Sequence, residues 1–357
     1  MSRILFHKDE LLRIGDEWKR FYKWELDKPM VFFGTVFSHF DEPKLKLRQG
    51  CFPMYPPEMS AEEIIEIEDA CMGCRAHVGD TYPCMSLNFG PGSLSAYFGS
   101  RLEVTDSLWF FPTAERLADI PDEMNAEYWW YRRVHEILDA ATAKWASTPV
   151  QICGSDMGNN LDVLAELRGN AALAMDLVDD PGLVHQKLRA ITKAWMRCYQ
   201  EEYEKIASVT GYSTAALGAL SEKKTARLQS DFGYMISPAM FEEFVMPDIL
   251  ELSDYLDDPC YHLDGIPQLQ HLPFILGVPK IRAIEFVMGA GQKPAAEWTH
   301  VFRQIHAAGK QCLCWIRAQE ALDLKRAMGG TLRGFGLYVG DFMSVEDARE
   351  LYRQLIS

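Results

Sequence analysis

Four short runs near the C-terminus decide the fold: PCYHLDG (259–265), IRAIEFVMG (281–289), QCLCWIRA (311–318) and LRGFGLYVGD (332–341). Each run is rich in apolar, β-branched or aromatic residues, ends in a polar or glycine-containing turn, and is separated from its neighbours by a helical pattern or a further turn. This alternation is typical of parallel α/β architecture, in which helices connect neighbouring parallel strands.

The same unit recurs toward the N-terminus, in the runs PMVFFGTVF (29–37), PCMSLNFG (83–90), TPVQICGSD (148–156) and ARLQSDFG (226–233). Eight candidate strands is the number that a closed (β/α)₈ TIM barrel needs. We therefore predict one α/β barrel domain over residues 1–357, with an N-terminal helical extension and long loops at the barrel mouth. Residues 212–221 lie too close to the next run to leave room for a helix and are interpreted as an excursion.

Helical patterns fill the remaining sequence. Residues 170–206 read as a long helical stretch that Pro181 interrupts, because proline is tolerated in the first turn of a helix but not in its interior. Ser237 and Ser344 are expected to cap two further helices. The segment 40–82 is long and rich in proline and acidic residues, and we expect it to form a loop that acts as a lid or substrate wall.

Charge and composition exclude several classes of partner. The formal net charge is −15, which argues against nucleic acid and anionic membrane surfaces because both require basic patches. No apolar run approaches the roughly 18 residues of a membrane span, and the amphipathic N-terminus lacks the apolar centre of a signal peptide. Nine scattered cysteines read as reduced thiols. A cytoplasmic protein that acts on a small molecule is expected.

Chemistry in a barrel lies at the C-terminal ends of the strands. His262 and Asp264 end the fifth run and, being two residues apart on a strand, point to the same side. A carboxylate beside an imidazole can orient it, or both can bind a metal. The alternative, a buried histidine paired with a local carboxylate for structural reasons, is equally compatible with this pattern.

The next two runs add further candidate ligands. Glu285 stands among apolar residues, where a carboxylate is costly unless it is paired or faces a wet cavity. The alternative is that Glu285 faces outward and pairs with a lysine or arginine of a neighbouring helix. Cys314 lies nearer the strand end than Cys312, and His262, Glu285 and Cys314 together would make an acceptable zinc set with an open position. Asp231 and Asp264 are expected to be catalytic, and the residues expected to bind substrate are Asn88, Asp156 and Tyr338.

Three segments resemble the uroporphyrinogen decarboxylase superfamily: NFGPGSLSAYFGS (88–100), QSDFGYMISPAMFEEFVMPDILEL (229–252) and YHLDG (261–265). The typical pattern has an Asp at a strand end, a Ser-Pro, a Phe-x-x-Phe and a Pro, followed by a strand that ends in His and Gly. The resemblance implies a barrel with a funnel-shaped active site. The middle motif is specific for the superfamily and not for one activity.

The superfamily contains two broad branches. True decarboxylases carry an Arg-Gln-Ala-Gly-Arg segment near the N-terminus, which is missing around residues 33–40, so uroporphyrinogen decarboxylation is not expected. Corrinoid-linked methyltransferases bind zinc through a His-x-Cys on the fifth strand and a later Cys. This chain keeps the histidine as His262, but it has Asp264 in place of that first cysteine and Tyr338 and Asp341 on the eighth run. The chain also resembles the related barrel of cobalamin-independent methionine synthase, which has a glutamate on the next strand. This resemblance implies that Glu285 is a further zinc ligand.

The resemblance therefore implies a methyltransferase that uses zinc, demethylates a small methoxylated or methylated compound, and passes the methyl group to a corrinoid carried by a partner protein. O-demethylation by the ether-cleaving enzymes of anaerobes is the favoured activity. Two alternatives stay open: a cofactor-free decarboxylase or lyase that uses Asp231 and His262 as acid and base, and a non-catalytic binding barrel. A homodimer is compatible with all three.

Overall fold

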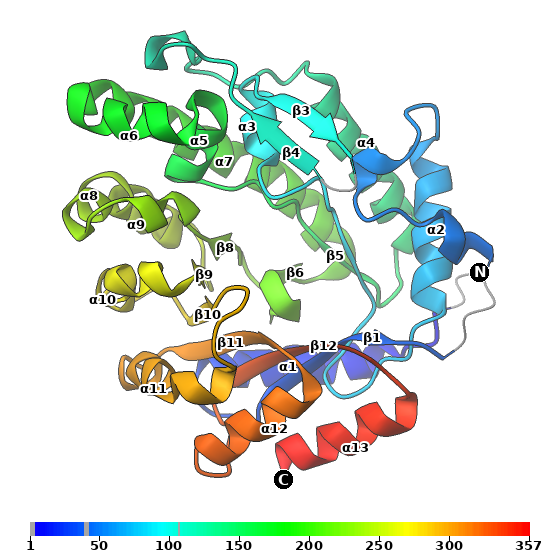
Figure 1. Cartoon of the computed structure of the whole chain (residues 1–357). Helices are drawn as coiled ribbons and strands as arrows, with labels where there is room; N and C mark the ends of the chain where they lie inside the picture. The colour runs from blue at the N-terminus through cyan, green and yellow to red at the C-terminus, as the bar shows by residue number, and fades with distance from the viewer. Residues whose placement is uncertain (1–3, 39–42, 106–107) are drawn as a thin grey trace.

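The centre of the molecule is a six-stranded parallel sheet (Figure 1), in a computed structural model that describes residues 4–38, 43–105 and 108–357. The strand order is β1-β12-β11-β10-β9-β8, and all neighbours run parallel. The carboxyl ends of these strands therefore lie at one edge of the sheet. Their bounds are β1 Met30–Val36, β8 Arg227–Leu228, β9 Cys260–Asp264, β10 Ala283–Val287, β11 Gln311–Ile316 and β12 Phe335–Met343.

Six further strands form three separate pairs. β2 (Cys84–Ser86) and β5 (Gln151–Cys153) pair in parallel, whereas β3 (Arg101–Val104) with β4 (Leu108–Phe111) and β6 (Ser213–Thr214) with β7 (Leu220–Ser221) are antiparallel. All eight predicted runs contain a strand, and the predicted α/β class is confirmed. The strand pairing itself joins six of these strands in one sheet and two in another, and it does not show a closed ring of eight.

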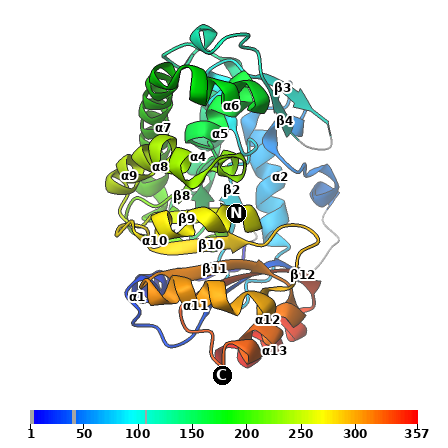
Figure 2. The ribbon, with the colours of Figure 1, turned by 60° about the vertical axis from the view of Figure 1, so that its left-hand side comes forward.

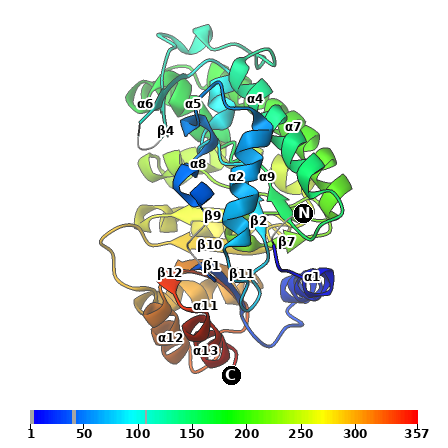
Figure 3. The same cartoon turned by 90° about the vertical axis from the view of Figure 1, so that its right-hand side faces the viewer.

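Helices follow most strands and cover the sheet. α11, α12 and α13 lie together on one side of it in Figures 2 and 3, packed on β11, β12 and β1 respectively. None of the described helices combines the length and apolarity that a bilayer crossing requires. The α-helices are α1 Lys8–Tyr22, α2 Ala61–Gly73, α3 Ser93–Tyr97, α4 Trp129–Trp145, α5 Asn160–Arg168, α6 Asn170–Asp179, α7 Pro181–Thr210, α8 Pro238–Phe244, α9 Met246–Tyr255, α10 Leu272–Leu276, α11 Thr299–Ala307, α12 Ala318–Ala327 and α13 Val345–Ile356.

The predicted helix boundaries are confirmed at three places. α6 ends at Asp179 and α7 begins at Pro181, where the missing N–H of proline costs no hydrogen bond. The side chains of Ser237 and Ser344 accept backbone N–H groups at the starts of α8 and α13. Each serine thereby satisfies one of the donors that a helix start leaves free.

The segment between the first two predicted strands differs from the expected loop. It contains two short 3₁₀ turns and the 13-residue helix α2. Ser60 and Glu63 form a reciprocal capping box at its start, and Ile64 and Ile65 are buried on its apolar side. The prolines and acidic residues around it led to the prediction of a loop, although the capping box at Ser60 and Glu63 indicates the start of a helix. Residues 39–42 of this segment lie outside the described residues.

The two faces of the sheet have different neighbours. On the inner face, Leu313 of β11 packs in one cluster with Ile14 and Trp18 of α1, the predicted N-terminal helix. On the outer face, the Cys312 thiol of the same strand reaches the Phe302 carbonyl of α11. Side chains alternate along a strand. On β11, the odd-numbered residues therefore face inward with Leu313, and the even-numbered residues face outward with Cys312. His262, Asp264 and Glu285 lie on the inner face, in register with Cys260 and Ala283 of the inner cluster.

Candidate metal centre

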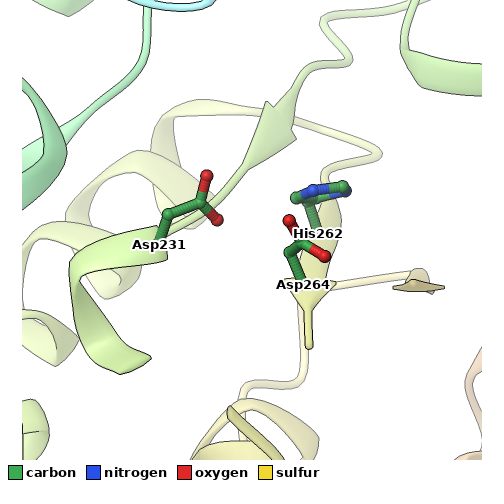
Figure 4. A group of neighbouring side chains, drawn as sticks. All are labelled: Asp231, His262 and Asp264. Carbon is green, nitrogen blue, oxygen red and sulfur yellow. The ribbon is translucent and has the colours of Figure 1, made fainter. Parts of the chain in front are cut away.

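Asp231, His262 and Asp264 meet at the carboxyl-terminal edge of the sheet (Figure 4). His262 and Asp264 project from the same face of β9, and Asp231 opens the 3₁₀ turn Asp231–Met235 that follows the neighbouring strand β8. Each residue offers one ligand atom, and these atoms all lie within 4.8 Å of one another. Figure 4 shows the Asp231 carboxylate directed across the gap toward the two side chains of β9.

Hydrogen bonds from two other elements fix the turn that carries Asp231. The backbone N–H groups of Asp231 and Phe232 donate to the carboxylate of Asp162 on α5, at 2.8 and 2.7 Å. The Gln268 amide donates to the Ser230 carbonyl at 2.7 Å. Burial and the Asp231 charge raise the pKa of Asp162 to about 8. A metal cation at this position would therefore reduce the repulsion between the neighbouring carboxylates of Asp162, Asp231 and Asp264.

His262 is held in one orientation by Glu285 of β10. The two residues are register partners in the sheet, and the His262 Nδ1 lies 2.9 Å from the Glu285 Oε2. Burial opposes the charged form of each, but their mutual hydrogen bond and attraction outweigh it, so the pKa of His262 is raised and that of Glu285 is lowered. Glu285, 2% exposed, also lies 3.6 Å from the Arg227 guanidinium. With Nδ1 engaged, Nε2 is the nitrogen that His262 can offer to a ligand.

This donor set fits a divalent metal ion. One imidazole nitrogen and two carboxylates supply three protein ligands and leave a position open, as in catalytic zinc sites. The contact between Glu285 and His262 matches the usual arrangement in which a carboxylate receives the second ring N–H of a metal-binding histidine. Asp231, His262 and Asp264 would therefore bind the ion, and Glu285 would orient the histidine.

The structure brings together only part of the zinc set expected from the sequence. Glu285 reaches the site as the hydrogen-bond partner of His262. Cys314 does not reach it, because it shares the outer face of β11 with Cys312 and is fully buried in the core beneath the helices. Burial, followed by the charge of Glu285, raises the pKa of the Cys314 thiol, which disfavours the thiolate that zinc requires. Asp231 and Asp264, expected to be catalytic, take the place of Cys314.

A cavity of about 440 Å³ is lined by all three residues predicted to bind substrate, Asn88, Asp156 and Tyr338, but by none of Asp231, His262, Asp264 and Glu285. Arg227, which lines the cavity, is the side chain that links the cavity wall to the metal centre. The Arg227 guanidinium forms an ion pair with Asp156 in the cavity wall and approaches Glu285 behind His262. A molecule in the cavity therefore lies one side chain away from the residues that hold His262.

Sequence reasoning missed Arg227 and Asp162. Arg227 is a charged residue inside an otherwise apolar run that ends at Asp231, and a cation in that setting needs a buried acidic partner. Arg227 could therefore have been predicted from the sequence as a residue of the site. Asp162 lies on a helix far away in the chain, and no local pattern links it to the turn that it fixes.

Comparisons with known proteins bear on the fold. No family model matches the sequence, and no curated protein matches it. The fold is similar to that of a methyltransferase. This solved structure, from Methanosarcina mazei, has a TM-score of 0.61, and the match covers 96% of this chain and 97% of that chain. The two sequences are 12% identical, so the likeness concerns the fold.

Proposed function

We propose that the chain is a metal-dependent methyltransferase of the uroporphyrinogen decarboxylase superfamily, with its strands arranged as a (β/α)₈ barrel. The observation that carries the proposal is the group of Asp231, His262 and Asp264, with Glu285 behind the histidine, which Arg227 links to the wall of a cavity of about 440 Å³. The three sequence motifs of the superfamily and the fold likeness to a methyltransferase support the same reading.

A zinc ion bound here would supply Lewis-acid chemistry at the donor oxygen or sulfur. The residues of the chain orient the metal ligands and hold the methyl donor. Glu285 keeps the His262 ring in one tautomer and one orientation. Asn88, Asp156 and Tyr338 hold the methyl donor in the cavity. Asp231 and Asp264 would hold the ion at the donor oxygen, which takes a proton from solvent water as the methyl group passes to the acceptor.

The proposed acceptor is a corrinoid carried by a partner protein, and the proposed donor is a small methoxylated or methylated compound. The chain carries a formal net charge of −15, which favours a partner with a basic docking surface. A flat methoxylated ring suits the cavity, whose wall includes Phe32 and Tyr338, stacked with centroids 5.4 Å apart.

Chelation is expected to abolish methyl transfer. Free cob(I)alamin serves as the acceptor, and a panel of small methoxylated arenes and thioethers serves as donors, under reducing and anaerobic conditions. At least one donor should convert the cob(I)alamin spectrum to that of methylcobalamin, and the conversion should stop after metal removal and return with added zinc. His262→Ala should be inactive with and without zinc. Transfer that persists in metal-free protein would contradict the proposed role of the metal.

The same residues support one other activity, a cofactor-free lyase acting on a small carboxylated substrate. Burial, opposed by the charge of His262, raises the pKa of Asp231, and the pKa of His262 is raised as well. An acid and a base this close could transfer a proton during decarboxylation. Release of carbon dioxide from a carboxylated substrate by chelated protein would favour this second activity.

A further inference from the structure

Three arginines line the cavity, and two of them are matched by an acid. Arg227 forms its ion pair with Asp156, and the Arg48 Nε lies 3.0 Å from a carboxylate oxygen of Glu68. Both arginines thus have their charge compensated within the protein. Arg75 lines the same cavity. Among the residues that the structure describes, Arg75 takes part in no ion pair, and its Nε is buried without a hydrogen-bond partner.

The Arg75 side chain is half-buried and its Nε is fully buried, so leaving this donor unpaired is costly, and the negative charge of Glu68 offsets only part of that cost. Burial and the like charge of Arg48 lower the pKa of Arg75. Glu68, the nearby acid, already holds Arg48 and accepts the Tyr55 hydroxyl at 3.2 Å. Buried charges in proteins are normally paired or bound to a ligand. The missing counter-charge is therefore expected to come from outside the protein.

Two neighbours of Arg75 in the cavity wall also carry unused polar groups. His77 follows two residues later along an extended segment, and both of its ring nitrogens are buried without a partner. Burial and the charge of Arg75 lower the pKa of His77 to about 4, so the ring is neutral at physiological pH and offers one N–H. Tyr338 of β12 also lines the cavity. Its hydroxyl lies over Gly34, where the absence of a Cβ leaves room for it.

We propose that Arg75, with His77 and Tyr338, forms a subsite for the carboxylate of a small aromatic ligand in this cavity. A carboxylate is planar and accepts two parallel hydrogen bonds from a guanidinium. Aromatic residues from several elements supply flat apolar walls for the rest of the ligand: Phe32, Tyr82, Trp195 and Tyr199. The inference rests on the proposed function in taking this cavity as the substrate site. The subsite would select a negatively charged substrate, and Arg75 would be the residue that recognises its carboxylate.

Binding of benzoate and of its neutral analogue benzamide tests the subsite by titration calorimetry on metal-free protein. The wild-type chain should prefer benzoate. Arg75→Gln should weaken benzoate binding roughly 10–100-fold, the range expected for losing charge-assisted hydrogen bonds. The same substitution should leave benzamide binding unchanged, which also shows that the variant is folded. Arg75→Lys should restore part of the affinity.

The matched control is Arg101→Gln, which removes an exposed arginine that is paired with Glu103 away from the cavity. It should bind both probes like the wild type. Equal affinity of Arg75→Gln and wild type for benzoate, no preference for benzoate over benzamide, or no binding of either probe at millimolar concentration would overturn the subsite. Because metal-free protein is used, such a failure leaves the metal centre untouched, and failure of metal binding leaves this result intact.

Discussion

Replacing His262 by alanine is expected to abolish stoichiometric zinc binding, while replacing Cys314 by alanine leaves it intact. The first change removes the one nitrogen donor of the site. The expected loss of affinity is more than about 100-fold, because removing only a hydrogen-bond partner of a metal ligand already costs 10–100-fold. Asp231→Asn and Asp264→Asn should weaken binding in the same direction. Competition with a zinc-binding dye measures the affinities.

Cys314→Ala is the matched control because it tests a cysteine on the other face of the sheet. The thiol is fully buried in the core and lies on the outer face of β11. Its removal should lower stability slightly and leave zinc affinity unchanged. If Cys314→Ala lost its zinc but unfolded like the wild type, Cys314 would be a zinc ligand. That result would contradict the assignment of Asp231, His262 and Asp264 as the ligands.

The second large effect is expected for Glu285→Gln. The glutamine keeps the size of the side chain but removes the charge that holds the His262 imidazole and attracts Arg227. Zinc affinity should fall by about 10–100-fold, because a ligand histidine that lacks its carboxylate partner is less basic and less well oriented. The measurement is the same dye competition, at a fixed pH.

Glu297→Gln is the control for this charge change. Glu297 is exposed and pairs with Lys293 four residues earlier, in the short turn Ala295–Trp298 that lies outside the sheet. That variant should bind zinc like the wild type. If Glu285→Gln also matched the wild type, the carboxylate behind His262 would have no role in metal binding.

Strand positions could be predicted because each strand is a compact apolar run bounded by turn residues. PCYHLDG and QCLCWIRA needed no other information, and β9 and β11 lie within them. The pairing between strands is a non-local property. The contrast between six strands in one sheet and the separate pair of β2 and β5 could not be seen in any single run. Helix α2 could have been predicted from Ser60 and Glu63, had its proline-rich surroundings not been read as a loop.

The face of a strand is where the site prediction failed. β11 is buried on both faces over most of its length, so its sequence has no polar alternation to indicate which side chains point inward. Cys314 therefore looked as available as His262. The role of Glu285 depends on its register opposite His262 in β10, which no spacing within one strand reveals. Asp231, His262 and Asp264 could all be found, because each ends a run at the edge where parallel strands meet.

X-ray absorption spectroscopy of the zinc-loaded protein identifies the atoms bound to the metal and so tests the ligand set itself. We predict a shell of nitrogen and oxygen atoms alone at about 2.0–2.2 Å, with the outer-shell signal of a single imidazole. A sulfur atom at about 2.3 Å would contradict it, since Asp231, His262 and Asp264 contain none.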